Sequence, residues 1–208
     1  MNKIISFSLW GNDPKYCIGA IKNAQIASNI YPGWITRFYL GNDVKENIIQ
    51  ELKNANAEIV PCEDTGWNGM FWRFLAADSE DIVLSRDTDS RLNMREKYAV
   101  EEWLKSDKDF HIMRDHPWHG TAILGGMWGA RNGLLKGLTQ LINSYKKNNQ
   151  YQVDQNFLRD VIYPRVVHNT FVHDEFFEKK PFPVKRENNE YVGAPYSHND
   201  VLEIKLPG

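Results

Sequence analysis

Strand-like and helix-like stretches alternate along the first third of the chain, and this order restricts the possible folds more than any other feature of the sequence. Asp13 and Pro14 follow the first apolar stretch as an N-cap and first-turn signal, and apolar residues then recur at helical spacing as far as Ala27. A strand, helix, strand, helix, strand order favours right-handed crossovers and a parallel sheet covered by helices on both faces. The three strands are predicted at residues 4–10, 34–43 and 57–62, with the second helix around residues 44–52.

The remaining segments continue this α/β pattern and end in an irregular tail from Pro181 onward. We predict one domain spanning residues 1–208, with a nucleotide-binding half over about 1–92 and an acceptor-binding half with the tail over about 93–208. The further elements are a helix carrying Phe71 and Phe74, a strand ending before Asp87, a helix from near Asn93, strands at 110–116 and 121–131, the latter broken by Gly125 and Gly126, and helices at 134–145 and 153–161.

Composition excludes several classes of protein. With 208 residues and 42% hydrophobic residues, the chain is long enough to bury its own core. A net charge of −2 gives no broad basic face, so we expect no nucleic acid and no anionic membrane as the main partner. Cys17 and Cys62 have neither a metal-site spacing nor a disulfide pattern, which fits a reducing compartment. We therefore expect a cytoplasmic protein without a transmembrane segment, whose first residues form a strand rather than a leader.

Two acids follow directly on a stretch that is apolar enough to be a buried strand. Asp87 and Asp89 come after residues 82–84 (IVL), so they belong at the carboxyl end of that strand, where α/β sheets bind ligands. Two carboxylates at positions i and i+2 can both point at one hard cation, because Mg²⁺ and Mn²⁺ prefer a few carboxylates and leave positions for phosphate oxygens. The simpler interpretation is that the two acids only cap and solvate a turn.

Other chemistries of such an acid pair agree less well with the sequence. A calcium-binding EF-hand loop counted from Asp87 needs Gly and Glu where the chain has Leu92 and Tyr98, so that reading fails. A phosphatase of the haloacid dehalogenase type places its acid pair after the first strand, whereas here several elements come earlier. The chain also has no phosphate-loop Gly-Lys-Ser/Thr pattern after Gly125-Gly126 and no Gly-x-Gly-x-x-Gly after its first strand.

Asp87-Thr88-Asp89 resembles the Asp-x-Asp motif of glycosyltransferases with the GT-A fold. Arg73 lies on the preceding helix, where several such enzymes keep an arginine that contacts the donor. Asp154-Gln155 is similar to the Asp-Gln segment that faces the reacting sugar in retaining, glycogenin-like transferases. The segments 111–131, 172–177 and 190–200 resemble a small group of glycosyltransferases from bacteria and large DNA viruses, chlorella viruses included. The resemblance implies a three-layer αβα fold with a mostly parallel sheet.

Roles for the charged residues follow from the resemblance and from the chemistry of the leaving group. A bound Mn²⁺ or Mg²⁺ would neutralise the charge that develops on a departing nucleoside diphosphate. We expect Asp89 to ligate the metal directly and Asp87 to reach it through water or to hold the donor ribose. Arg73, Arg86 and Arg91 are expected to contact phosphate or sugar, although each would also serve in an ordinary ion pair.

The resemblance also implies a histidine near the C-terminus that completes the metal shell. His173 is the first candidate and His168 the second, although a lone histidine is more often structural. Asp115 and Asp154 are candidates at the sugar end, either to hold hydroxyls or, for Asp115, to act as general base. An Asx turn before Pro117 and the dipole of a helix N-terminus are the competing explanations for these two acids.

The sequence therefore predicts a metal-dependent glycosyltransferase that moves a hexose from a nucleotide sugar to a glycan acceptor. The donor is expected to be UDP-linked, of the UDP-glucose or UDP-rhamnose type, and the location to be the host cytoplasm if the protein is viral. A Mg²⁺-dependent phosphohydrolase of the dehalogenase type and a noncatalytic carbohydrate-binding module remain as alternatives. The Asp-Gln segment favours retention of configuration, while an Asp115 base would favour inversion.

Overall fold

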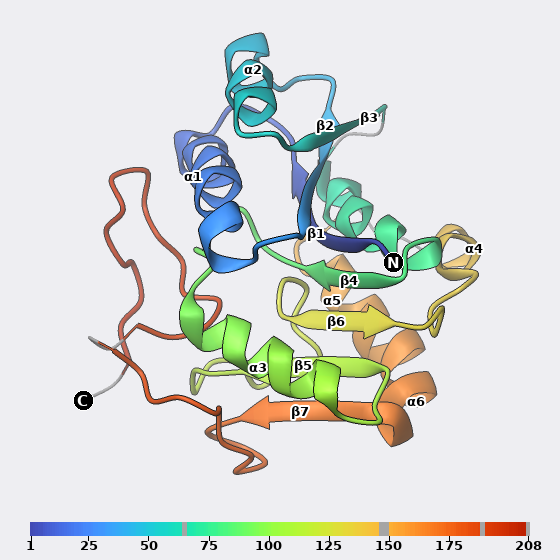
Figure 1. Cartoon of the computed structure of the whole chain (residues 1–208). Coiled ribbons are helices and arrows are strands. Elements are labelled where there is room, and N and C mark those ends of the chain that lie inside the picture. Colours follow the sequence, from blue (N-terminus) through green and yellow to red (C-terminus); the bar gives the residue numbers. More distant parts are fainter. Residues whose placement is uncertain (64–65, 146–149, 188–189, 207–208) are drawn as a thin grey trace.

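The computed structural model describes residues 1–63, 66–145, 150–187 and 190–206 (Figure 1). Within these residues, seven strands form one sheet in the order β3-β2-β1-β4-β6-β5-β7. Strand β6 is antiparallel to β4 and β5, and every other neighbouring pair is parallel, which confirms the mostly parallel sheet. The strands are β1 (Lys3–Leu9), β2 (Ile35–Gly41), β3 (Glu58–Cys62), β4 (Ile82–Ser85), β5 (Phe110–Arg114), β6 (Trp128–Arg131) and β7 (Thr170–Asp174).

Helices cover both faces of this sheet and make the three layers that the sequence predicts. On one face the core contains Ile5 and Leu84 together with side chains of α1, α2 and α3; on the other it contains Ile4 and Val83 with side chains of η1, α4 and α5. Successive residues of a strand point to opposite faces, so neighbours such as Ile4 and Ile5 enter different cores. The helices are α1 (Pro14–Ile30), α2 (Glu46–Asn54), α3 (Met94–Lys105), α4 (Leu138–Ser144), α5 (Val153–Phe157), α6 (Tyr163–Val166), the 3₁₀ helices η1 (Gly66–Asp78) and η3 (Val167–Asn169), and the π-helix η2 (Leu158–Ile162).

The two helix starts expected from capping signals are confirmed. The side chain of Asp13 accepts a hydrogen bond from the backbone N–H of Lys15 at 2.9 Å, and Pro14 occupies the first turn of α1. The side chain of Asn93 accepts one from the N–H of Glu96, also at 2.9 Å, at the start of α3. Each cap satisfies a backbone donor that the helix itself leaves unpaired.

Three elements differ from the prediction. The strand expected over residues 121–131 is confined to β6, because the segment before it forms turns that bring Gly125 and Gly126 against the polar side chains of the site. The helix expected from residue 134 begins at Leu138, after Gly137 with φ +89°. Strand β7 was not predicted from the sequence; it pairs with β5 at the edge of the sheet and mixes polar with apolar residues.

The tail runs along the carboxyl ends of the parallel strands. It carries no helix or extended strand in its described part, and it passes beside α1 before reaching the C-terminal end (Figure 1). The sheet itself takes β1 to β4 from residues 1–92 and β5 to β7 from residues 93–208. Among the described residues, the structure has no helix that is both long enough and apolar enough to cross a membrane.

Candidate active site

The acid pair lies where the sequence places it, directly beyond the carboxyl end of β4. All four residues of β4 are buried, and β4 pairs with β1 inside the sheet. The side chains that follow are partly open to solvent: that of Asp87 is 43% exposed and that of Asp89 is 20% exposed. A buried strand thus delivers two accessible carboxylates to the edge at which parallel sheets bind ligands.

Arg73 joins the acid pair to a second carboxylate. Its guanidinium donates to Asp87 through Nη1 and to Oδ2 of Asp154 through Nη2, the latter at 2.8 Å. The backbone N–H of Arg73 donates to Oγ of Ser8 at 2.9 Å, which fixes η1 against β1. Burial raises the pKa of Asp154 and the nearby Asp87 adds to the rise, while Arg73 opposes it. Arg73, Asp87 and Asp154, which the sequence singles out separately, therefore form one cluster.

Gly125 and Gly126 let the chain pass directly over this cluster. A Cβ atom on Gly126 would overlap Oδ2 of Asp87, and one on Gly125 would overlap both Nη2 of Arg73 and Oδ2 of Asp154. Two buried polar atoms of the cluster, Nε of Arg73 and Oδ1 of Asp154, have no hydrogen-bond partner among the described residues. Buried polar groups are normally satisfied, so these atoms mark a place where a bound molecule or water belongs.

Asp89 pairs with a lysine that the sequence analysis did not single out. The ammonium of Lys15, in the first turn of α1, lies 3.1 Å from Oδ2 of Asp89 and 2.7 Å from Oε2 of Glu203 in the tail. Burial raises the pKa of Asp89, and the charge of Asp87 raises it further. A cation therefore already sits between two carboxylates at the outer end of the acid pair.

The tail is attached to the same turn. The backbone N–H of Tyr196 donates to the carbonyl oxygen of Asp89 at 2.8 Å. Arg91 turns to the tail rather than to the acids, with Nη2 2.9 Å from Oδ1 of Asp200 and its guanidinium 5.3 Å from the ring of Tyr196. His198 is exposed two residues beyond Tyr196. His173 and His168 were the candidates for a late histidine, because nothing in the sequence pattern indicates that the tail folds back over Asp89.

Arg86 is not brought to the acid pair. It is buried, its Nε lies 3.0 Å from Glu96, and its Nη1 donates to the carbonyl oxygens of Ser85 and Trp128. The physical reason is that adjacent residues leaving a strand point to opposite faces, so Arg86 enters the core beneath α3 while Asp87 faces the cluster. The expected donor contact of Arg86 is not supported by this position.

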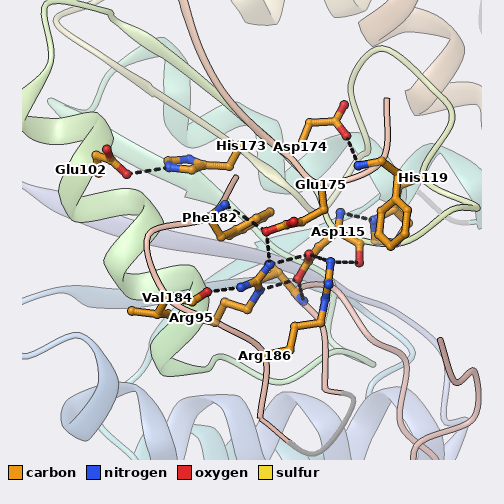
Figure 2. A network of polar contacts seen from close by, with 12 residues as sticks. Arg95, Glu102, Asp115, His119, His173, Asp174, Glu175, Phe182, Val184 and Arg186 are labelled. Carbon is orange, nitrogen blue, oxygen red and sulfur yellow. Dashed lines mark hydrogen bonds and ion pairs between the residues drawn. The ribbon is translucent and has the colours of Figure 1, made fainter. Parts of the chain in front are cut away.

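Asp115 holds the tail in a buried network (Figure 2). Arg95 binds both of its carboxylate oxygens at 2.8 Å, Arg186 adds a further ion pair, and the backbone N–H of Val192 donates to Oδ2 at 3.0 Å. The side chain is fully buried and its oxygens are engaged by these donors. Its position favours a structural function over the expected contact with an acceptor.

His173 lies in a second buried network, beside α3 (Figure 2). Its Nδ1 is 2.8 Å from Nε2 of His111, and its Nε2 is 3.0 Å from Oε2 of Glu102, so both ring nitrogens have partners. His168 is exposed in η3, which leads into the edge strand β7. In the part of the chain that the structure describes, no three His, Cys, Asp or Glu side chains are grouped as a ready metal site.

An open cavity of about 590 Å³ adjoins the cluster. It lies between the loop at residues 118–124 and the segment at residues 151–159, and Gln155 is among the residues that line it. Gln155, for which the resemblance implies a place facing the reacting sugar, follows Asp154 and borders this cavity. Leu124 and Gln155 of its lining are the chain neighbours of Gly125 and Asp154, which lie in contact with Arg73.

The fold is shared with solved glycosyltransferases of the GT-A type, as the sequence predicts. One similar structure is a glycosyltransferase involved in the glycosylation of the major capsid of PBCV-1, with 16% identity, 88% of this chain and 91% of that chain covered, and a TM-score of 0.57. No protein-family model matches the chain, and no curated protein matches it by sequence. The likeness therefore establishes the fold.

A second similar protein is glucosyl-3-phosphoglycerate synthase from Mycobacterium tuberculosis. Its complex with uridine diphosphate is 15% identical, covers 90% of this chain and 73% of that chain, and has a TM-score of 0.54. Another of its structures, in complex with Mn²⁺, UDP-glucose and phosphoglyceric acid, is 16% identical with a TM-score of 0.52 and covers 82% of this chain and 69% of that chain.

Proposed function

We propose that the protein is a metal-dependent glycosyltransferase that moves a hexose from a UDP-linked sugar to a glycan acceptor. The observation that carries the proposal is the cluster of Asp87, Asp89, Arg73 and Asp154 at the carboxyl end of β4. It occupies the ligand-binding edge of a fold shared with enzymes whose structures contain UDP-glucose and Mn²⁺. A fold alone does not define an activity, so the chemistry of the cluster is the stronger support.

The residues present suit a divalent cation at Asp89. Its carboxylate is partly open, it stands two residues from a second carboxylate, and the ammonium of Lys15 marks a position at which a cation is stable. Mn²⁺ and Mg²⁺ favour such oxygen ligands, and a bound ion would stabilise the negative charge of a departing diphosphate. We assign Asp89 as the direct ligand and Asp87 as a ligand through water or a contact of the donor ribose. His198 replaces His173 as the histidine best placed to approach this site.

The other cluster residues serve the sugar end of the donor in this proposal. Arg73 holds Asp87 and Asp154 in fixed positions, and its charge lies where it can stabilise a phosphate. The unpaired Oδ1 of Asp154 and the amide of Gln155 supply acceptors and donors for sugar hydroxyls. Because the oxygens of Asp115 are occupied by Arg95, Arg186 and Val192, we do not assign it as the general base.

Isothermal titration of the protein with UDP, with and without Mn²⁺, tests the proposal. We expect Mn²⁺-dependent binding of UDP that Asp89→Asn weakens by at least about tenfold, since even residues behind metal ligands change affinity by that amount. The matched control is Asp107→Asn, which removes a carboxylate that is 87% exposed on the surface. The control should bind like the wild type.

Other outcomes would identify the alternatives. Hydrolysis of small phosphate esters without nucleotide binding would favour the phosphohydrolase. Binding of glycans without any nucleotide binding would favour the carbohydrate-binding module. Equal UDP affinity in Asp89→Asn and the wild type would remove the acid pair from the proposed site.

A further inference from the structure

The cavity beside the cluster has a lining suited to one kind of ligand. Its walls come from the loop at residues 118–124 and from residues 151–159 on and before α5 and η2, and its volume is about 590 Å³. That volume falls in the range of sites for small molecules. Neither the acid pair nor Arg73 lines it, so the cavity is separate from the position proposed for the diphosphate.

The cavity nevertheless adjoins the reacting end of the site at two points in the chain. Leu124 lines it and immediately precedes Gly125, which packs against Arg73 and Asp154. Gln155 lines it and immediately follows Asp154. A molecule in the cavity would therefore lie next to a sugar held by the cluster, which is the place a transferase keeps for its acceptor.

The lining combines neutral polar groups with exposed aromatic rings. Gln152, Gln155 and Asn156 contribute amides, which donate and accept hydrogen bonds as sugar hydroxyls do. The indole of Trp118 is 75% exposed and the ring of Tyr151 is 63% exposed, although both residues border the cavity. An aromatic face with a polar edge suits the apolar face of a pyranose ring.

Among the described residues that line the cavity, charge is nearly absent. Arg159 is the one charged side chain among the described residues that line the cavity. Its Nε and Nη2 are bound by the two carboxylate oxygens of Asp160 at 2.7 and 2.9 Å. A phosphorylated or carboxylated ligand would require free, convergent cations, which this lining does not offer.

We infer that this cavity is the acceptor site and that it selects an uncharged saccharide, with one sugar ring stacked on Trp118. The role as acceptor site rests on the proposed function, whereas the preference for a neutral saccharide rests on the lining. Trp118 and the three amides are the residues that determine specificity.

Binding to an array of neutral, sialylated and phosphorylated oligosaccharides, in the presence of UDP and Mn²⁺, tests this inference. We expect neutral glycans to bind, Trp118→Ala to weaken binding by about tenfold, and Trp118→Phe to restore part of it, because stacking on an aromatic face contributes about 1 kcal/mol or more. Tyr98→Ala, at an exposed aromatic residue on α3 outside the cavity, is the control.

Titration of UDP on the same variants separates this inference from the proposed function. Trp118→Ala should bind UDP with Mn²⁺ as the wild type does. Three results would each overturn the inference. They are preferential binding of anionic glycans that Arg159→Gln abolishes, glycan binding that Trp118→Ala does not change, and failure of every neutral glycan to bind. If neutral glycans bind through Trp118 but the protein binds no UDP, the assignment of the saccharide site would stand and the proposed transferase activity would be wrong.

Discussion

At Gly125 and Gly126 the site has no space for a Cβ atom. Gly125 and Gly126 pass so close to Arg73, Asp87 and Asp154 that even a methyl group on either glycine would overlap a charged side chain. In the sequence the pair indicated a break in a strand and a glycine-rich turn that agrees with the resemblance, but no contact with the acids. Its function in the site depends on contacts between segments far apart in the chain, so it becomes visible only in the fold.

Gly126→Ala should weaken Mn²⁺-dependent UDP binding by about tenfold, because the added methyl group displaces the carboxylate of Asp87, an overpacking that costs about 1 to 3 kcal/mol. Gly120→Ala is the matched control, since its methyl group would meet only the ring of Phe177 at 3.7 Å. Titration and thermal unfolding of both variants are the measurements. Wild-type affinity in Gly126→Ala would show that the position of Asp87 does not matter for the nucleotide.

The residue types of the site were easier to predict than the directions of the side chains. Asp87, Asp89, Arg73 and Asp154 could be selected because acids and an arginine near a buried strand end have a specific chemistry. Residue type alone did not indicate that Arg86 and Asp87 point in different directions. The side chain of Arg86 enters the core on the other face of the sheet.

At the scale of elements, α1 contributes a charge to the site through its first turn. Lys15 binds Asp89 and also Glu203, so the same ammonium connects the site, the helix and the tail. Pro14 and the Asp13 cap predicted where this helix begins. Which side chain of the first turn reaches the acids depends on the path of the tail, and the tail has no periodic pattern from which its path could be predicted.

Lys15→Met should strengthen Mn²⁺ binding in the absence of nucleotide, because the ammonium competes with the metal for Asp89. The expected gain is about two- to fivefold, the range that a partly exposed ion pair contributes. Lys22→Met is the control, since it removes a different pair between α1 and the tail, that with Asp200. Calorimetric titration with MnCl₂ measures both. Weaker binding in Lys15→Met alone would mean that Lys15 supports the metal rather than excluding it.

The regular elements were predictable to the extent that their pattern was periodic. β1, α1, β2 and α3 have clear spacing and caps, and the structure confirms them. The helix predicted at residues 153–161 corresponds to α5 and η2, whereas α6, η3 and the edge strand β7 were not predicted from the sequence. Val153 and Phe157 of α5 pack in the same core as Phe71 and Phe74 of η1, whereas β7 pairs with β5 through polar as well as apolar residues. These tertiary contacts, rather than local propensity, fix the geometry of α5 and β7.

For the molecule as a whole, histidines that stay neutral in the folded chain link stability to pH. Burial, with a further contribution from His116, lowers the pKa of His119 to about 3, and burial lowers that of His111 well below its usual value. The unfolded chain binds these protons below about pH 6.5 while the folded chain does not. Stability is therefore fully present above that pH and falls as the pH decreases, by up to about 1.4 kcal/mol per pH unit for each histidine.

His119→Asn should reduce this loss of stability in acid. Nδ1 of His119 accepts a hydrogen bond from the N–H of Asp115 at 3.0 Å, and an asparagine oxygen can accept in its place without titrating. Urea unfolding at pH 7.5 and pH 5.0 gives the difference for the wild type and the variant. An equal difference in both proteins would show that His119 does not carry the pH dependence.

The contacts that complete the site join the two ends of the chain, and this determines when the site can form during folding. Lys15 and Glu203 are separated by 188 positions, and Arg73 and Asp154 by 81. To form a contact of such long range, the chain must first give up the conformational entropy of the long loop between the two residues. These contacts therefore form late and slow the folding of the chain. A ribosome must therefore release the chain as far as Glu203 before the Lys15–Glu203 contact can close over the acids, and a nascent chain shorter than this would present them without the tail.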